Sequence, residues 1–176
     1  RAKYFLPDYQ TRVASSAILL DRFEVAGAKS VALSADDLRV VISATADHVV
    51  PGQELGILAD FAIAPGWHIY GRPLPDNYTA TAIEFDGDSV ASQEFEFPTP
   101  EKVTFAALGE TLPVYHDKVR AKGKILIRSG LKPGEHQLKG KLRFQECSQD
   151  VCKIPQSVPF EIPIRIEAMT PAAPKI

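Results

Sequence analysis

The chain has 176 residues, of which 45% are hydrophobic, 24% charged and 9% aromatic, a composition typical of a folded globular protein. Its formal net charge of −2 argues against nucleic-acid binding, which needs a concentrated basic surface. Its apolar runs are all shorter than the ~18 residues that a membrane-spanning helix requires, so direct membrane insertion is not expected. The chain starts at Arg1, and we therefore expect a piece of a longer, processed protein.

The N-terminal segment differs in pattern from the rest of the chain. Apolar residues recur at three- and four-residue steps in Tyr9–Phe23, which predicts a short amphipathic helix. Residues 24–34 are small and polar and indicate a linker. The predicted division of the chain is 1–34 for the arm and linker, 35–170 for the main domain and 171–176 for a tail.

From Leu38 onward, apolar residues alternate with polar ones, which is typical of antiparallel strands with one buried face. The fourteen prolines suit loops and sheet edges and disfavour long helices. We therefore predict an all-β, immunoglobulin-like antiparallel β-sandwich with a short N-terminal helical arm. The predicted strands are Leu38–Ala46, Glu54–Ile63, Trp67–Tyr70, Tyr78–Phe85, Gln93–Phe97, Lys118–Arg128, Glu135–Gln145 and Val158–Ile166.

Cys147 and Cys152 are the two cysteines of the chain, and they bound the segment CSQDVC between two of the most regular strands. Four intervening residues allow the chain to bend back far enough for a disulfide. One pair does not make a structural zinc site, which needs four ligands. The spacing alone leaves a structural disulfide and a redox-active pair open. A disulfide that closes so short a loop contributes only about 2 kcal/mol, which favours exchange chemistry.

Four segments, taken in order, resemble the N-terminal periplasmic domain of the DsbD family, the bacterial transmembrane thiol:disulfide interchange proteins. The resemblance extends over roughly residues 36–168. The segments are GWHIY at Gly66–Tyr70, FPTP at Phe97–Pro100, GETLPVY at Gly109–Tyr115 and FQECSQDVCKIP at Phe144–Pro155.

The resemblance implies an immunoglobulin-like domain whose cysteine pair receives electrons from a membrane-embedded donor and exchanges them with thioredoxin-fold proteins in the periplasm. Carried over to this chain, Cys147 and Cys152 are the redox pair, and Cys152 forms the mixed disulfide with partners. His68 and Tyr70 fall where the family places aromatic side chains beside the cysteines. His68 is also a candidate local base. No metal or cofactor is implied.

A cap that shields the cysteines would lie around Phe105–Gly109. The sequence departs from the family here, because Ala107-Leu108-Gly109 stands where the best-known cap has an aromatic residue just before the glycine. Shielding would therefore fall to Leu108 or to Phe105. Near the cysteines, Glu146 disfavours a thiolate and Lys153 favours one.

The N-terminal segment Tyr4–Phe23 is similar to the end of peroxiredoxin-like thioredoxin-fold domains, which implies a two-module redox protein. The leading hypothesis is thus an electron-transfer module, a protein-disulfide reductase if the resemblance holds. One alternative is an immunoglobulin-like interaction or scaffold domain with a structural disulfide. Another is a metal-handling β domain that uses Cys147, Cys152 and a histidine. The sequence names neither the partners nor the direction of electron flow.

Overall fold

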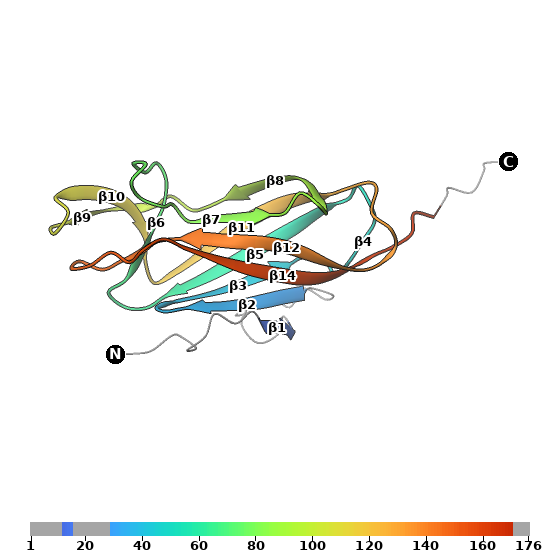
Figure 1. Ribbon diagram of the computed structural model, residues 1–176, viewed down its shortest axis with the longest axis horizontal. Helices are drawn as coiled ribbons and strands as arrows, with labels where there is room; N and C mark the ends of the chain where they lie inside the picture. The colour runs from blue at the N-terminus through green and yellow to red at the C-terminus, as the bar shows by residue number, and fades with distance from the viewer. Residues whose placement is uncertain (1–11, 16–28, 171–176) are drawn as a thin grey trace.

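The computed structural model describes residues 12–15 and 29–170, and strands make up all the regular structure in these residues. Figure 1 shows their arrangement. All eight predicted strands overlap a strand of the structure. The strands are β1 (Arg12–Ser15), β2 (Lys29–Ala35), β3 (Leu38–Ala44), β4 (His48–Val49), β5 (Glu54–Ile63), β6 (His68–Tyr70), β7 (Ala82–Phe85), β8 (Val90–Glu96), β9 (Glu101–Phe105), β10 (Glu110–Tyr115), β11 (Lys118–Ile127), β12 (Gly134–Phe144), β13 (Glu146–Cys147) and β14 (Gln156–Ile166).

The strands form three sheets. A six-stranded sheet has the order β1-β2-β3-β5-β11-β8, and a four-stranded sheet has the order β4-β14-β12-β7. These two sheets form the sandwich, with β14 against β2 and β7 against β8. The strand pairs are antiparallel except for the short pair of β14 and β4. The predicted all-β, immunoglobulin-like sandwich is confirmed.

The core lies between the two sheets of the sandwich. Its composition follows from the alternation of apolar and polar residues in the sequence. On β5, every second side chain is buried, and β14 shows the same pattern. Burial of apolar side chains in this way supplies most of the free energy that favours folding. The inward residues of β5 are Leu55, Ile57, Ala59, Phe61 and Ile63.

The N-terminal part of the domain differs from the expectation. Residues 29–34, expected as linker, belong to β2, which pairs with β3 along its whole length. Both faces of β2 are largely covered, so its small residues are buried beside Val31 and Leu33, and a small, polar composition did not mean an exposed linker. Of the predicted helix Tyr9–Phe23, the described residues are Arg12–Ser15, which form β1. The rest of that helix and the tail at 171–176 lie outside the described residues.

A third, four-stranded sheet with the order β13-β6-β10-β9 lies at one end of the sandwich. Figure 1 shows the β9–β10 hairpin and the loop between β13 and β14 reaching this same end, at the left of the view. The sandwich therefore brings the cysteine loop next to the predicted cap. Within the described part of the chain, no helix has the length and apolar character that crossing a membrane would require.

Candidate functional site

The cysteine loop is a tight hairpin between β13 and β14. A disulfide joins Cys147 to Cys152, whose Cα atoms lie 4.1 Å apart and pair as an isolated antiparallel bridge. Ser148 closes the loop, because its N–H donates to the carbonyl oxygen of Val151 at 2.8 Å. Its Oγ in turn accepts from the backbone N–H of Val151 at 3.1 Å. The loop thus holds its shape through local hydrogen bonds as well as through the disulfide.

The two cysteines differ in burial. Cys147 is completely buried, whereas Cys152 is partly exposed. The neighbours of Cys152 are apolar and exposed: Val151 has 55% of its surface exposed and Ile154 has 81%. Cys152 is therefore the more accessible cysteine of the pair, with exposed apolar residues close to it in the chain, while Cys147 is covered.

Tyr70 contacts both sulfur atoms. Cys147 pairs with His68 across the β13–β6 ladder, and Tyr70 lies two residues further along β6, so the three side chains share one face of the sheet. The Tyr70 hydroxyl lies 2.8 Å from Cys147 Sγ and 3.4 Å from Cys152 Sγ. Burial raises the pKa of Tyr70 to about 12. The phenol therefore keeps its proton at neutral pH and can donate it to a sulfur atom.

Cys147 and Tyr70 lie in a small apolar cluster that is separate from the main core. Apart from Cys152, its other members come from the β9–β10 hairpin and the loop after β6. The cluster surrounds the sulfur of Cys147 with hydrocarbon and keeps water away from it. The members are Tyr70, Phe105, Leu112, Val114 and Cys147, with partly buried Leu74, Tyr78, Val103 and Cys152 packed against them.

His68 lines the site, but it does not supply the hydrogen bonds to the sulfur atoms, which come from Tyr70. Its ring packs edge-on against Phe105 at 5.6 Å and against His116 at 6.1 Å between centroids. Burial lowers the pKa of His68, so the ring is neutral at pH 7. Among the described residues its buried Nδ1 has no hydrogen-bond partner. In this geometry His68 packs against Phe105 and lines one side of the site.

The predicted cap corresponds to the turn of the β9–β10 hairpin. Gly109 adopts a left-handed φ of 66°, which favours glycine at this position. The backbone N–H groups of Leu108 and Gly109 both donate to the carbonyl oxygen of Phe105, at 3.1 and 2.9 Å. Phe105 is 1% exposed and its ring lies 6.2 Å from that of Tyr70, whereas Leu108 is 37% exposed at the tip. Of the two candidate shields, Phe105 is the one that packs against the site.

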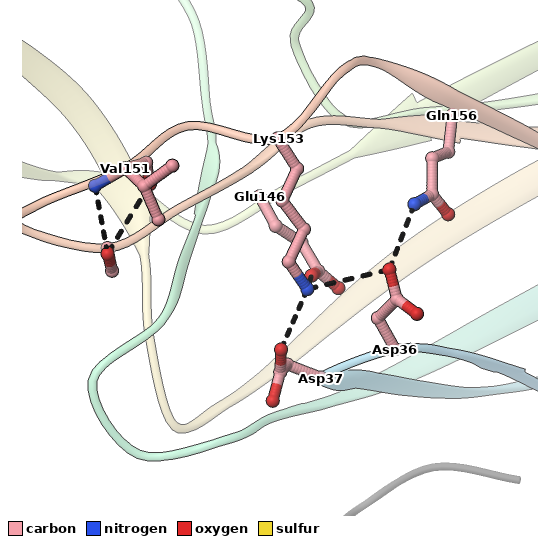
Figure 2. A network of polar contacts seen from close by, with 7 residues as sticks. Asp36, Asp37, Glu146, Val151, Lys153 and Gln156 are labelled. Atoms are coloured by element: carbon pink, nitrogen blue, oxygen red, sulfur yellow. Dashed lines mark hydrogen bonds and ion pairs between the residues drawn. The ribbon is translucent and has the colours of Figure 1, made fainter. Parts of the chain in front are cut away.

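An ion-pair network that the sequence did not predict involves the residues directly flanking the two cysteines. Lys153 Nζ lies 2.7 Å from Glu146 Oε2 and 2.7 Å from Asp37 Oδ2 (Figure 2). Burial raises the pKa of Glu146, and Lys153 opposes that shift. For Lys153, burial lowers the pKa, but the bonds to Asp37 and Glu146 outweigh it and the net pKa is raised. The signal in the sequence was the pattern E-C-x4-C-K, with opposite charges immediately outside the two cysteines.

The described part of the chain offers no ligand set for the metal-handling alternative. Within residues 12–15 and 29–170, no three His, Cys, Asp or Glu side chains gather in a way that could hold a metal ion. Both thiols are joined in the disulfide. The arrangement is suited to breaking and re-forming one S–S bond between a partly exposed cysteine and a buried one.

Comparison with known proteins places this site within a matched region. A family model described as "Thiol:disulfide interchange protein DsbD, N-terminal" matches residues 37–163, which include both cysteines and the β9–β10 hairpin. A search of curated proteins found no match.

Two solved structures are similar to this chain. The N-terminal periplasmic domain of ScsB from Proteus mirabilis has a TM-score of 0.53 and 22% identity, covering 71% of this chain and 46% of that one. This likeness concerns the fold, and the present chain spans less than half the length of that ScsB chain. The reduced N-terminal domain of DsbD from Neisseria meningitidis has a TM-score of 0.41 and 19% identity, covering 64% of this chain and 82% of that one.

Proposed function

Because this chain belongs to the family of the N-terminal domain of the thiol:disulfide interchange protein DsbD, we propose that it transfers electrons through its Cys147–Cys152 pair to or from other thiol proteins. The observation that carries the proposal is the unequal exposure of the two sulfurs. Cys152 is reachable, and Cys147 is buried under Tyr70 and Phe105. A purely structural disulfide needs no such asymmetry.

The exchange follows from this geometry as a two-electron step. A partner thiolate attacks Cys152 Sγ, the S–S bond breaks, and its electron pair leaves on Cys147 Sγ, which then takes up a proton. The Tyr70 hydroxyl, 2.8 Å from that sulfur, stabilises the developing negative charge. The partner's second thiolate then attacks the partner's first sulfur, which is bonded to Cys152 in the mixed disulfide. This step forms the partner's disulfide and releases the Cys152 thiolate. The domain ends as a dithiol and the partner as a disulfide, and the reverse sequence lets the reduced domain reduce a partner.

The partners in this proposal are thioredoxin-fold redox proteins and a membrane-embedded electron donor. The domain works in the bacterial periplasm or another extracytoplasmic space, where disulfides persist. Support comes from the family match and from the exposed apolar side chains of Val151 and Ile154, close to Cys152 in the chain, which a docking protein can cover.

A trapping experiment tests the division of roles between the two cysteines. A thioredoxin-fold protein is activated at its surface cysteine as a mixed disulfide with thionitrobenzoate and is then added to each single variant. We expect Cys147→Ser to release thionitrobenzoate and form a stable protein–protein disulfide through Cys152. Cys152→Ser should release it at least tenfold more slowly, because its remaining thiol is buried. Equal trapping by the two variants, or faster trapping by Cys152→Ser, contradicts the assignment.

A further inference from the structure

Glu146 and Lys153 close the cysteine hairpin without involving sulfur. Glu146 immediately precedes Cys147 and Lys153 immediately follows Cys152. Their side chains meet at 2.7 Å, and the backbone N–H of Lys153 donates to the carbonyl oxygen of Glu146 at 2.9 Å. The two strands that lead into and out of the loop are therefore joined one residue outside the disulfide, by an ion pair and a backbone hydrogen bond.

The same ammonium group ties the hairpin to the sandwich. Asp36 and Asp37 form the turn between β2 and β3, and their carboxylates lie 3.5 and 2.7 Å from Lys153 Nζ (Figure 2). The ammonium also lies 4.2 Å from the centroid of the Trp67 ring, directly before β6, within the range of a cation–π contact. Three separate parts of the chain thus converge on Lys153. We call Glu146, Lys153 and Asp37 the clasp.

Burial makes the clasp firmer than a surface ion pair. The Glu146 side chain is 1% exposed and that of Lys153 is 23% exposed. A buried carboxylate must keep its partner, because an unpaired charge in such a place is strongly unfavourable. By contrast, Lys139 and Glu161 on β12 and β14 lie 3.9 Å apart with 60% and 55% exposed, and such exposed pairs constrain the chain little.

We propose that Glu146 and Lys153 are positioning residues that keep Cys147 and Cys152 side by side after reduction, and thereby make the disulfide harder to reduce. The inference rests on the proposed function and adds that these two residues help to set the reduction potential of the disulfide. When the S–S bond is broken, the clasp remains, because none of its bonds uses a sulfur atom. The two strands stay together, so the effective concentration of one thiol near the other stays high. The same proximity lets Cys147 displace a partner from Cys152.

The test uses the full 176-residue chain in glutathione buffers of defined composition, with the dithiol fraction read by alkylation and mass. The double variant Glu146→Gln/Lys153→Met removes both charges and leaves no unpaired carboxylate buried. We expect its half-reduction at about tenfold lower [GSH]²/[GSSG] than the unaltered chain, a potential about 30 mV less negative. The matched control Lys139→Met/Glu161→Gln removes an exposed pair and should keep the original midpoint.

Asp37→Asn removes the shortest ion pair between Lys153 and the sandwich, leaves the weaker Asp36 and Trp67 contacts, and keeps the Glu146–Lys153 pair. It should shift the midpoint in the same direction by about threefold. A merely structural role lowers the melting temperature of both redox forms equally and leaves the potential unmoved. That result for the double variant overturns the inference, and if this variant does not fold, an unmoved midpoint for Asp37→Asn overturns it instead. Failure of the unaltered chain to equilibrate with glutathione or with a thioredoxin-fold dithiol contradicts the proposed function itself.

Discussion

At the scale of single residues, the chemistry of the site depends on one phenol beside two sulfurs of unequal exposure. Tyr70 is completely buried, and its hydroxyl is closer to Cys147 than to Cys152. In the proposed exchange, Cys147 is the sulfur that leaves with negative charge. The shorter contact of the Tyr70 hydroxyl is therefore to the sulfur atom on which that charge develops. His68, the candidate base from the sequence, instead packs against Phe105 and is kept neutral by burial.

Replacing Tyr70 by Phe should slow exchange while leaving the fold in place. The variant loses the O–H that stabilises the departing Cys147 thiolate, a bond of about 1.4 kcal/mol or tenfold in rate. We expect reduction by a thioredoxin-fold dithiol, followed by stopped flow, to be about tenfold slower. Tyr115→Phe is the control, because its hydroxyl donates to the Pro98 carbonyl oxygen at 2.7 Å and not to sulfur. Equal rates for Tyr70→Phe and the unaltered chain would show that this hydroxyl plays no part.

At the scale of elements, the β9–β10 hairpin is the cover of the site. Its strands pair from Glu110 opposite Phe105 to Val114 opposite Glu101. At the far end of the hairpin, His116 Nε2 lies 2.5 Å from Glu101 Oε2 and its Nδ1 lies 2.9 Å from Asp117 Oδ2. These bonds raise the pKa of His116. The hairpin is thus fastened at its base, and its Phe105 lies over Tyr70 and His68.

Phe105→Ala should uncover the disulfide. Loss of a buried ring costs about 3 kcal/mol of stability and leaves a cavity beside Tyr70. Reduction by a small thiol such as dithiothreitol should then be faster by on the order of tenfold, because access to sulfur limits exchange. The matched variant Leu108→Ala, at the exposed tip, should change stability by less than about 0.5 kcal/mol and keep the original rate. Faster reduction in Leu108→Ala with no change in Phe105→Ala would show that Leu108, and not Phe105, shields the disulfide.

At the scale of the whole molecule, the main core of the sandwich is built without the cysteine loop. The main core lies between the two sheets of the sandwich and contains neither Cys147 nor Cys152. The disulfide closes a loop with a sequence separation of 5, too short to restrict the unfolded chain by much. We therefore expect the sandwich to keep its fold when the disulfide is reduced.

Reduction of the disulfide should lower the free energy of unfolding by only about 2 kcal/mol. For a domain of this size, that corresponds to a fall in melting temperature of roughly 4–8 °C. Thermal unfolding followed by circular dichroism, with and without reductant, measures it, and Cys147→Ala/Cys152→Ser should give the same value. Unfolding on reduction at 25 °C would instead favour the alternative of an interaction domain with a structural disulfide.

Several features of this protein follow from its sequence by itself. Regular alternation in stretches such as Glu54–Ile63 determined the strands, since successive side chains of a strand point to opposite faces. The position of the cysteine pair after the strand that ends at Phe144 also followed from the order of residues. The family resemblance rested on short segments around these same positions.

Other features were decided only by the tertiary structure. The small residues of β2 look like a linker until β3 and β14 cover them, and composition does not reveal that cover. The choice of Phe105 over Leu108 as shield depends on which way each side chain points in the hairpin. Lys153 lies 116 residues from Asp37 in sequence, and their contact exists because the β2–β3 turn and the cysteine loop end at the same edge of the sandwich. Local pattern determines elements, but contacts between distant residues depend on how the sheets pack.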